Sequence, residues 1–401
     1  MPKVLLVWEQ GGNLGHLARL LPIARSLRDK GAETEFVIPG QGVARSTVEC
    51  AGFRWSAAPS LALSAGEGPA INHADVLLRC AFGLPTDQLH ARVLQWQSIF
   101  VASAATAAVI DASPLALYAA RSMGLNAVAL GHGFEIPTTF EPHPCFAPWL
   151  AGAAERALRC DEQLAHSIDG LAQLFGTETA PRSLNALYAP PGTALCTWPE
   201  LDHFERPPGF NTPYIGPIWS DLPGAQPQAF APRPGPKVLA YLNLVDKRHD
   251  LLWQALGKCG ANVLVISPSG DARAAEAARG RGIEVVERAV LLAPLLKASD
   301  AVVSNGGIGL CSMALQSAKP LLLLPEHVEQ GILANRLARQ GLAAATIRWG
   351  DKANIFQRAE TLLGAGTPAP ALLELAARRA AFSPAEAVNQ LVFRLLPDAL
   401  Q

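Results

Sequence analysis

Apolar and polar residues form two successive repeating series along the 401-residue chain, and a proline-rich segment separates the two. Within each series, short apolar runs typical of strands buried on both faces precede stretches in which apolar residues recur at helical spacing. The chain opens this way, because the run Val4–Trp8 and a Gly-rich turn precede a helical pattern that continues through Leu27. Such alternation predicts a parallel, doubly wound sheet in each series.

The predicted strands are short and apolar. In the first series they cover 4–8, 35–38, 53–57, 107–111 and 126–130. In the second series they cover 237–242, 262–267, 283–287, 301–304 and 320–324. Two helical segments, near 369–381 and 384–396, close the chain. The expected fold class is therefore α/β, with two Rossmann-like domains.

Nine prolines fall between residues 207 and 236, and this density marks the boundary between the two series. We divide the chain into a first domain at 1–222, a linker at 223–236 and a second domain at 237–380. The remaining segment, 381–401, is expected to be a helix that could pack back on the first domain. Ligands of such proteins bind between domains, so a central cleft is expected.

Composition narrows the function classes. A net charge of −1 gives no electrostatic reason to expect a nucleic-acid partner. No apolar run approaches the roughly 18 residues of a membrane span, and the N-terminus lacks a signal-peptide pattern, so we expect a cytoplasmic protein. The positive mean hydropathy leaves room for peripheral membrane contact. Seven scattered cysteines, none in a Cys-x-x-Cys pair, argue against a disulfide framework or a zinc site. Nothing in the sequence indicates the oligomeric state.

A glycine-rich turn in the second half is a candidate phosphate site. The predicted strand 301–304 is followed by Asn305-Gly306-Gly307-Ile308-Gly309, and a helix is expected from about Leu310. Glycines allow a ligand to approach the backbone closely, and a helix N-terminus offers free N–H groups and a positive dipole end. These features predict a diphosphate cradle. The alternative is a tight strand-to-helix turn without a ligand.

A candidate base lies in the first half. His16 follows the turn that contains Gly12 and Gly15, and Asp111 ends the fourth predicted strand. In the strand order 3-2-1-4-5, strands one and four are neighbours, so both residues reach the carboxyl edge where ligands bind. A carboxylate on the far nitrogen makes a histidine an oriented general base. The alternatives are a helix-start histidine that only caps and a strand-end Asx turn.

Several motifs together resemble family 1 glycosyltransferases. Asp300–Gly307 and Ala318-Lys319-Pro320, followed by Pro325, Glu329-Gln330 and Asn335, are similar to the donor-binding signature of that family. Tyr214-Ile215-Gly216-Pro217 and Gly15-His16 resemble two further elements. The resemblance implies a GT-B fold, with the acceptor on the first domain and the nucleotide sugar on the second.

Residue roles follow from this resemblance. It implies catalysis by His16 and Asp111, with inversion at the anomeric carbon and a UDP- or dTDP-sugar as co-substrate rather than a cofactor. The diphosphate would contact Asn305, Gly306, Gly307 and Gly309. The donor sugar would contact Glu329 and Gln330, and the base would lie near Arg288 and Val290. Further residues expected at the cleft are Gly12, Gly15, His132 and His327.

The sequence also departs from the family pattern. Asn305 replaces a histidine, Leu310 a hydroxyl residue and Met313 an acid. Phosphate binding would therefore depend on backbone groups and the helix dipole, or the donor would lie in a different position. The absence of an Asp-x-Asp motif predicts that no divalent metal holds the diphosphate. Two alternatives stay open: a nucleotide-sugar epimerase of the same fold, and a degenerate, non-catalytic binding subunit. The acceptor is not identified by the sequence.

Overall fold

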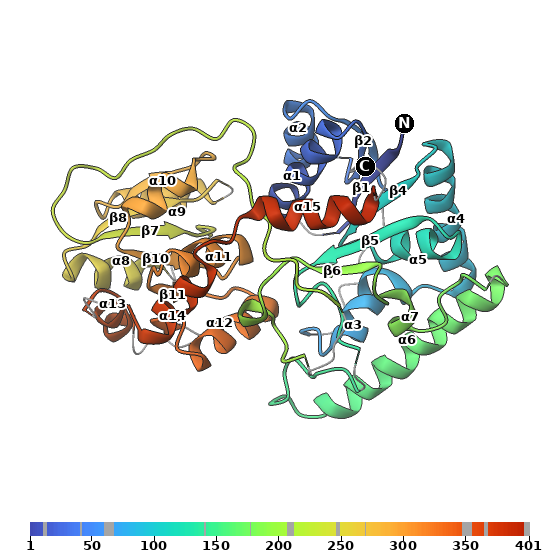
Figure 1. Ribbon diagram of the computed structural model, residues 1–401. Helices are drawn as coiled ribbons and strands as arrows, with labels where there is room; N and C mark the ends of the chain where they lie inside the picture. The colour runs from blue at the N-terminus through green and yellow to red at the C-terminus, as the bar shows by residue number, and fades with distance from the viewer. Residues whose placement is uncertain are drawn as a thin grey trace. The chain divides into compact units, whose positions relative to one another are not determined.

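The computed structural model describes residues 1–10, 14–40, 42–59, 68–139, 142–176, 178–206, 212–245, 249–268, 270–346, 355–364 and 368–396. The chain forms two compact units. The first comprises Met1–Ser220 with Pro384–Gln401, and the second comprises Asp221–Ser383. Each unit is built on its own parallel sheet, and the sheets are labelled in Figure 1.

The first unit contains a six-stranded sheet in the order β3-β2-β1-β4-β5-β6. This confirms the predicted order 3-2-1-4-5, and every pairing is parallel. The strands are β1 (Lys3–Trp8), β2 (Glu33–Ile38), β3 (Arg54–Ala57), β4 (Ala107–Asp111), β5 (Asn126–Gly131) and β6 (Thr193–Leu195). The three-residue β6 was not predicted, because so short a run carries no periodicity.

Helices lie on both faces of this sheet (Figure 1). The helical elements of the first unit are α1 (Gly15–Asp29), α2 (Val43–Cys50), α3 (His73–Leu77), η1 (Leu78–Phe82), α4 (Thr86–Ala102), α5 (Pro114–Ser122), α6 (Ala153–Phe175), α7 (Leu184–Leu187), η2 (Pro199–Leu201) and α15 (Pro384–Leu395). The π-helical turn η1 joins α4, α5 and α6 in one apolar core against the sheet. In α1, the predicted apolar positions, from Leu17 to Leu27, are fully buried.

The second unit repeats the design, with strand order β12-β11-β10-β7-β8-β9. Its strands are β7 (Lys237–Tyr241), β8 (Asn262–Ile266), β9 (Glu284–Val286), β10 (Ala301–Ser304), β11 (Leu321–Leu323) and β12 (Ala345–Thr346). Its helices are α8 (His249–Lys258), α9 (Ala272–Arg279), α10 (Leu292–Ala298), α11 (Ile308–Gln316), α12 (Val328–Arg339), α13 (Ile355–Gly364) and α14 (Pro370–Arg379). Both sheets thus confirm the α/β class. Among the described residues, no helix is long and apolar enough to cross a membrane.

The part of the proline-rich segment from Gln226 onward belongs to the second unit and is hydrogen-bonded to the sheet there. Gln226 forms an isolated parallel bridge with Val290. The Gln228 amide donates to the Glu284 carboxylate at 3.0 Å. The Asn262 side chain donates to the Ala231 carbonyl at 2.9 Å. The prolines prevent regular secondary structure in this segment. Two of these hydrogen bonds join it to the first residues of β8 and β9.

The C-terminal helix α15 belongs to the first unit and packs against α1 and β5. It is the red helix near the C label in Figure 1. Asn126, at the start of β5, donates through its side-chain amide to the Leu395 carbonyl at 3.4 Å. The helix therefore covers the apolar surface of α1, which carries His16.

Shortening Leu391 to alanine tests this packing. Leu391 is fully buried, so Leu391→Ala should lower the free energy of unfolding by about 2–5 kcal/mol. Phe393, on the same helix, is 53% exposed, and Phe393→Ala should change the free energy of unfolding by no more than about 0.5 kcal/mol. Urea denaturation of the full chain measures both. Equal losses would contradict the described packing.

Candidate functional site

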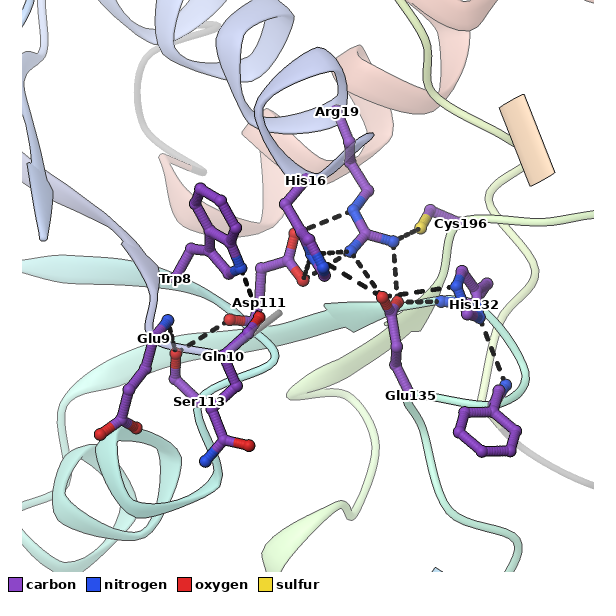
Figure 2. A network of polar contacts seen from close by, with 11 residues as sticks. Trp8, Glu9, Gln10, His16, Arg19, Asp111, Ser113, His132, Glu135 and Cys196 are labelled. Atoms are coloured by element: carbon purple, nitrogen blue, oxygen red, sulfur yellow. Dashed lines mark hydrogen bonds and ion pairs between the residues drawn. The ribbon is translucent and has the colours of Figure 1, made fainter. Parts of the chain in front are cut away.

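A cluster of charged side chains lies at the carboxyl ends of β1, β4 and β5, beside the start of α1 (Figure 2). The β1–β4 register places Trp8 opposite Asp111. His16, in the first turn of α1, stacks on the Trp8 indole with 5.0 Å between ring centroids. The same histidine reaches Asp111, with 2.9 Å between Nδ1 and Oδ1. The predicted adjacency of His16 and Asp111 is confirmed.

Burial and charge act against each other on His16. Burial favours the neutral imidazole, but the charge and hydrogen bond of Asp111, together with Glu135, outweigh it and raise the pKa of His16. The Asp111 side chain is completely buried, whereas His16 keeps 14% of its side chain exposed. Nδ1 of the ring is therefore held by Asp111, while part of the side chain stays accessible.

Arg19 joins this pair from the next turn of α1. It is a buried cation, and its Nε and Nη2 donate to the two carboxylate oxygens of Asp111 at 2.9 and 2.5 Å. This geometry is bidentate and charge-assisted, the strongest form of arginine–carboxylate contact. Asp111 therefore accepts from Arg19 and also lies within hydrogen-bond distance of His16 Nδ1.

Glu135 completes the network from the loop after β5. Its Oε2 accepts from Arg19 Nη1 at 2.8 Å, and its Oε1 accepts from Nη2 at 3.1 Å. The backbone N–H of His132 donates to Oε2 at 2.9 Å. A Cβ atom on Gly131 would lie only 2.8 Å from the Cβ of Glu135, so glycine is needed for this approach. Arg19 holds the pKa of Glu135 well below its usual range, although burial alone would raise it.

The remaining neighbours are uncharged or peripheral. Cys196 accepts from Arg19 Nη1 at 3.3 Å, and burial raises the pKa of its thiol to about 12, so it stays protonated. His132 Nε2 lies 3.4 Å from Glu135 Oε1 and stacks on His203. His132, predicted for the cleft, therefore contacts the network through Glu135.

This cluster has the spacing of a metal site but already contains a cation. Among the described residues of the first unit, His16, Asp111 and Glu135 are close enough together to share a metal ion. The Arg19 guanidinium instead lies between the two carboxylates and pairs with both. A metal ion would have to displace a fully hydrogen-bonded arginine.

Two residues of this network were not predicted. Arg19 lies within an otherwise apolar helix face, between Leu17 and Leu20, and a buried charge at such a position indicates a carboxylate partner. Glu135 lies three residues after His132, which was predicted for the cleft. Gly15 begins α1, beside His16, as expected. Gly12 lies outside the described residues.

The glycine turn of the second unit has the predicted form. β10 ends at Ser304, and α11 begins at Ile308 with Gly307 as its N-cap. Gly306 has a φ of +104°, which only glycine adopts easily. No side chain among the described residues caps α11, and no acid occupies its first turn. Its first N–H groups and dipole are thus available to an anion.

Asn305 and Gln330 have structural bonds at this turn. The Asn305 amide donates to the Leu324 carbonyl at 3.1 Å, and its oxygen accepts from the Asn243 N–H at 3.3 Å. Gln330 is buried, and its oxygen accepts from the Glu326 N–H at 2.8 Å. The departures Leu310 and Met313 are both buried, so their side chains belong to the core.

The other predicted donor residues lie at separate places in the second unit. Glu329, in the first turn of α12, has an oxygen 3.6 Å from Nδ1 of the half-exposed His327. Val290 is buried, and Arg288 donates to the Gln228 side chain at 2.9 Å. Their predicted contacts with sugar and base stay predictions.

Comparisons with known proteins define the class of fold. No model of a known family and no curated protein matches the sequence. The glycotransferase of kitacinnamycin is 17% identical, with a TM-score of 0.69 over 98% of this chain and 100% of that one. Spinosyn rhamnosyltransferase SpnG is 17% identical, with a TM-score of 0.65 over 98% and 99%.

The glycosyltransferase SsfS6 of Streptomyces sp. SF2575 is also 17% identical, with a TM-score of 0.61 over 98% of this chain and 99% of that one. These similarities extend over both units. At such low identity they define the fold, which is the GT-B fold of family 1-type glycosyltransferases.

Glu9, directly after β1, provides a test of the buried electrostatics beside the site. Among the described residues, neither oxygen of its carboxyl group has a hydrogen-bond partner. Burial raises the pKa of Glu9 from 4.5 to about 8, despite the opposing charge of Arg92. The group is therefore neutral at pH 7 in the folded protein and ionised in the unfolded chain.

Because folding raises this pKa, the contribution of Glu9 to stability is complete below pH 4.5 and is lost as pH rises towards 8. Between these two pH values, the free energy of unfolding should fall by on the order of 1 kcal/mol for each pH unit because of Glu9. Glu9→Gln should become more stable than wild type as pH rises, measured by urea unfolding from pH 5 to 8. Glu162→Gln, exposed on α6, should show no such gain. Parallel curves for wild type and Glu9→Gln would contradict the buried, neutral state.

Proposed function

We propose that this protein is an inverting glycosyltransferase that moves a sugar from a nucleoside diphosphate to an acceptor hydroxyl, with His16 as general base. One observation carries the proposal. On a GT-B fold, a partly exposed histidine at the carboxyl edge of the first sheet is bonded through Nδ1 to a buried carboxylate, Asp111.

The geometry suits proton transfer. With its proton on Nδ1, His16 donates to Asp111 and leaves Nε2 unprotonated. An acceptor hydroxyl at Nε2 would lose its proton as it attacks the anomeric carbon, and the imidazolium that forms would be stabilised by Asp111 and Glu135. Attack opposite the leaving diphosphate inverts the anomeric centre. The raised pKa of His16 makes the neutral imidazole a stronger base.

The second unit would receive the leaving diphosphate. The uncapped start of α11 at Gly307 offers N–H groups and a positive dipole end to its charge, whereas the N–H of Gly306 already donates to the Ser304 hydroxyl at 3.1 Å. Such stabilisation needs no metal ion. SpnG, VinC and SsfS6 have been solved with thymidine diphosphate, which supports a dTDP-sugar, or a UDP-sugar, as donor.

The acceptor belongs to a class suggested by the same neighbours. SpnG has been solved with the spinosyn aglycone. We therefore propose a small-molecule aglycone with a free hydroxyl as acceptor.

Removing the imidazole tests the proposed base. His16→Ala should lower the rate of transfer by at least about 10²-fold, the usual contribution of general base catalysis. Its affinity for dTDP, measured by calorimetry, should stay within about threefold of wild type. His166→Ala, exposed on α6, is the matched control and should keep full activity. Unchanged transfer by His16→Ala would contradict the proposal.

Two further experiments distinguish the glycosyltransferase from the epimerase and from the non-catalytic binding subunit. Change of the donor sugar without any acceptor would indicate an epimerase. A thermal-shift panel of UDP, dTDP, GDP and their sugars without any response would favour a non-catalytic subunit.

A methyl group on Gly307 tests the diphosphate cradle. A Cβ atom there meets no protein atom within 4 Å, and its φ is −63°, so Gly307→Ala should leave the melting temperature unchanged. The methyl group would occupy the space proposed for the diphosphate, and dTDP affinity should fall at least about tenfold.

Gly257→Ala, at an equally open position on α8 of the same unit, should leave dTDP affinity unchanged. Equal dTDP affinity of wild type and Gly307→Ala would place the nucleotide elsewhere.

A further inference from the structure

Nδ1 of His16 has two neighbours with opposite requirements. Asp111 Oδ1, at 2.9 Å, can only accept a hydrogen bond when ionised. Arg19 Nη2, at 3.1 Å, can only donate. The imidazole can satisfy one of them at a time, and the choice decides which ring nitrogen carries the proton in the neutral form.

The imidazole can act as a base at Nε2 in only one of these two arrangements. If Nδ1 donates to Asp111, Nε2 has a free lone pair and can take a proton. If Nδ1 accepts from Arg19, the proton lies on Nε2, and the ring cannot deprotonate an acceptor there. Arg19 therefore supports Asp111 and also competes with it for His16.

Glu135 is placed to resolve this competition. It accepts from both terminal nitrogens of Arg19, including the Nη2 that faces His16. Its own position is secured by the His132 N–H and by the room that Gly131 leaves. Figure 2 shows Arg19 held between Asp111 and Glu135, with His16 beside it.

Glu135 also supplies a negative charge near His16 that the Arg19–Asp111 pair alone lacks. Arg19 and Asp111 alone form a neutral pair, so the imidazolium would gain little from Asp111. The carboxylate of Glu135, with Oε1 at 3.8 Å from Nδ1, returns one negative charge to the site. The other titratable neighbours are His132, which contacts Glu135, and Cys196, which contacts Arg19 as a neutral thiol.

We propose that Glu135 is a positioning residue that keeps Arg19 from donating to His16 and thereby fixes the proton of the neutral imidazole on Nδ1. The inference deepens the proposed function, on which its role in catalysis rests. Its structural content is independent of any activity, because the tautomer is a property of the protein without ligands.

The tautomer can be measured directly. Protein labelled with ¹⁵N-histidine gives distinct long-range ¹H–¹⁵N correlations for the two tautomers, and His16 is assigned by the loss of its signals in His16→Ala. Above the pKa of His16, wild type should show the proton mainly on Nδ1. In Glu135→Gln the proton should lie mainly on Nε2, and the pKa of His16 should fall.

A double variant distinguishes positioning from damage to the fold. Arg19→Met with Glu135→Gln removes one positive and one negative charge together with the competing donor. Asp111 is then the partner left to His16, so the proton should return to Nδ1. Asp75→Asn disturbs another arginine-paired carboxylate of the same unit, with Arg79 and Arg156, and should leave the His16 signals unchanged.

The proposal would be overturned if Glu135→Gln kept the wild-type tautomer, or if the double variant retained the proton on Nε2. With an acceptor in hand, Glu135→Gln should lower kcat about tenfold or more and shift its pH profile to lower pH, with dTDP affinity within about threefold. A missing transfer activity in wild type would refute the proposed function but leave the tautomer result intact. The two failures are therefore distinguishable.

Discussion

The buried guanidinium of Arg19 between Asp111 and Glu135 is the interaction on which the arrangement of the first unit's site depends. Burying charges is costly unless they are paired and fully hydrogen-bonded. Here one cation pairs with two carboxylates, and the negative charge that remains on the carboxylates raises the pKa of His16. The ionic cluster thus orients the imidazole and raises the pKa of His16, while Arg19 lowers the pKa of Glu135.

The fold supplies this cluster through ordinary structural rules. Parallel pairing of β1 with β4 brings Asp111 beside Trp8, on which His16 stacks. Helical periodicity places Arg19 three residues after His16, on the same face of α1. The second unit uses the same strand–turn–helix design differently, because the turn after Gly306 leaves the first backbone N–H groups of α11 without a side-chain cap.

Much of the fold could be predicted from the sequence, since apolar runs and helical periodicity are local signals. The strand order then brought His16 and Asp111 together across the sheet. Arg19 and Glu135 could not be placed the same way, because their pairing depends on the loop after β5 and on the space left by Gly131. The roles of Asn305 and Gln330 were equally hidden, since both make bonds to backbone groups of other segments.

The stereochemistry of the product tests the central claim most directly. A dTDP-sugar of known anomeric configuration is incubated with an aglycone that carries a free hydroxyl, and the new glycosidic bond is examined by NMR through its one-bond C–H coupling at the anomeric carbon. Direct attack by a hydroxyl that His16 deprotonates gives a single product of inverted configuration. A product of retained configuration would contradict this mechanism.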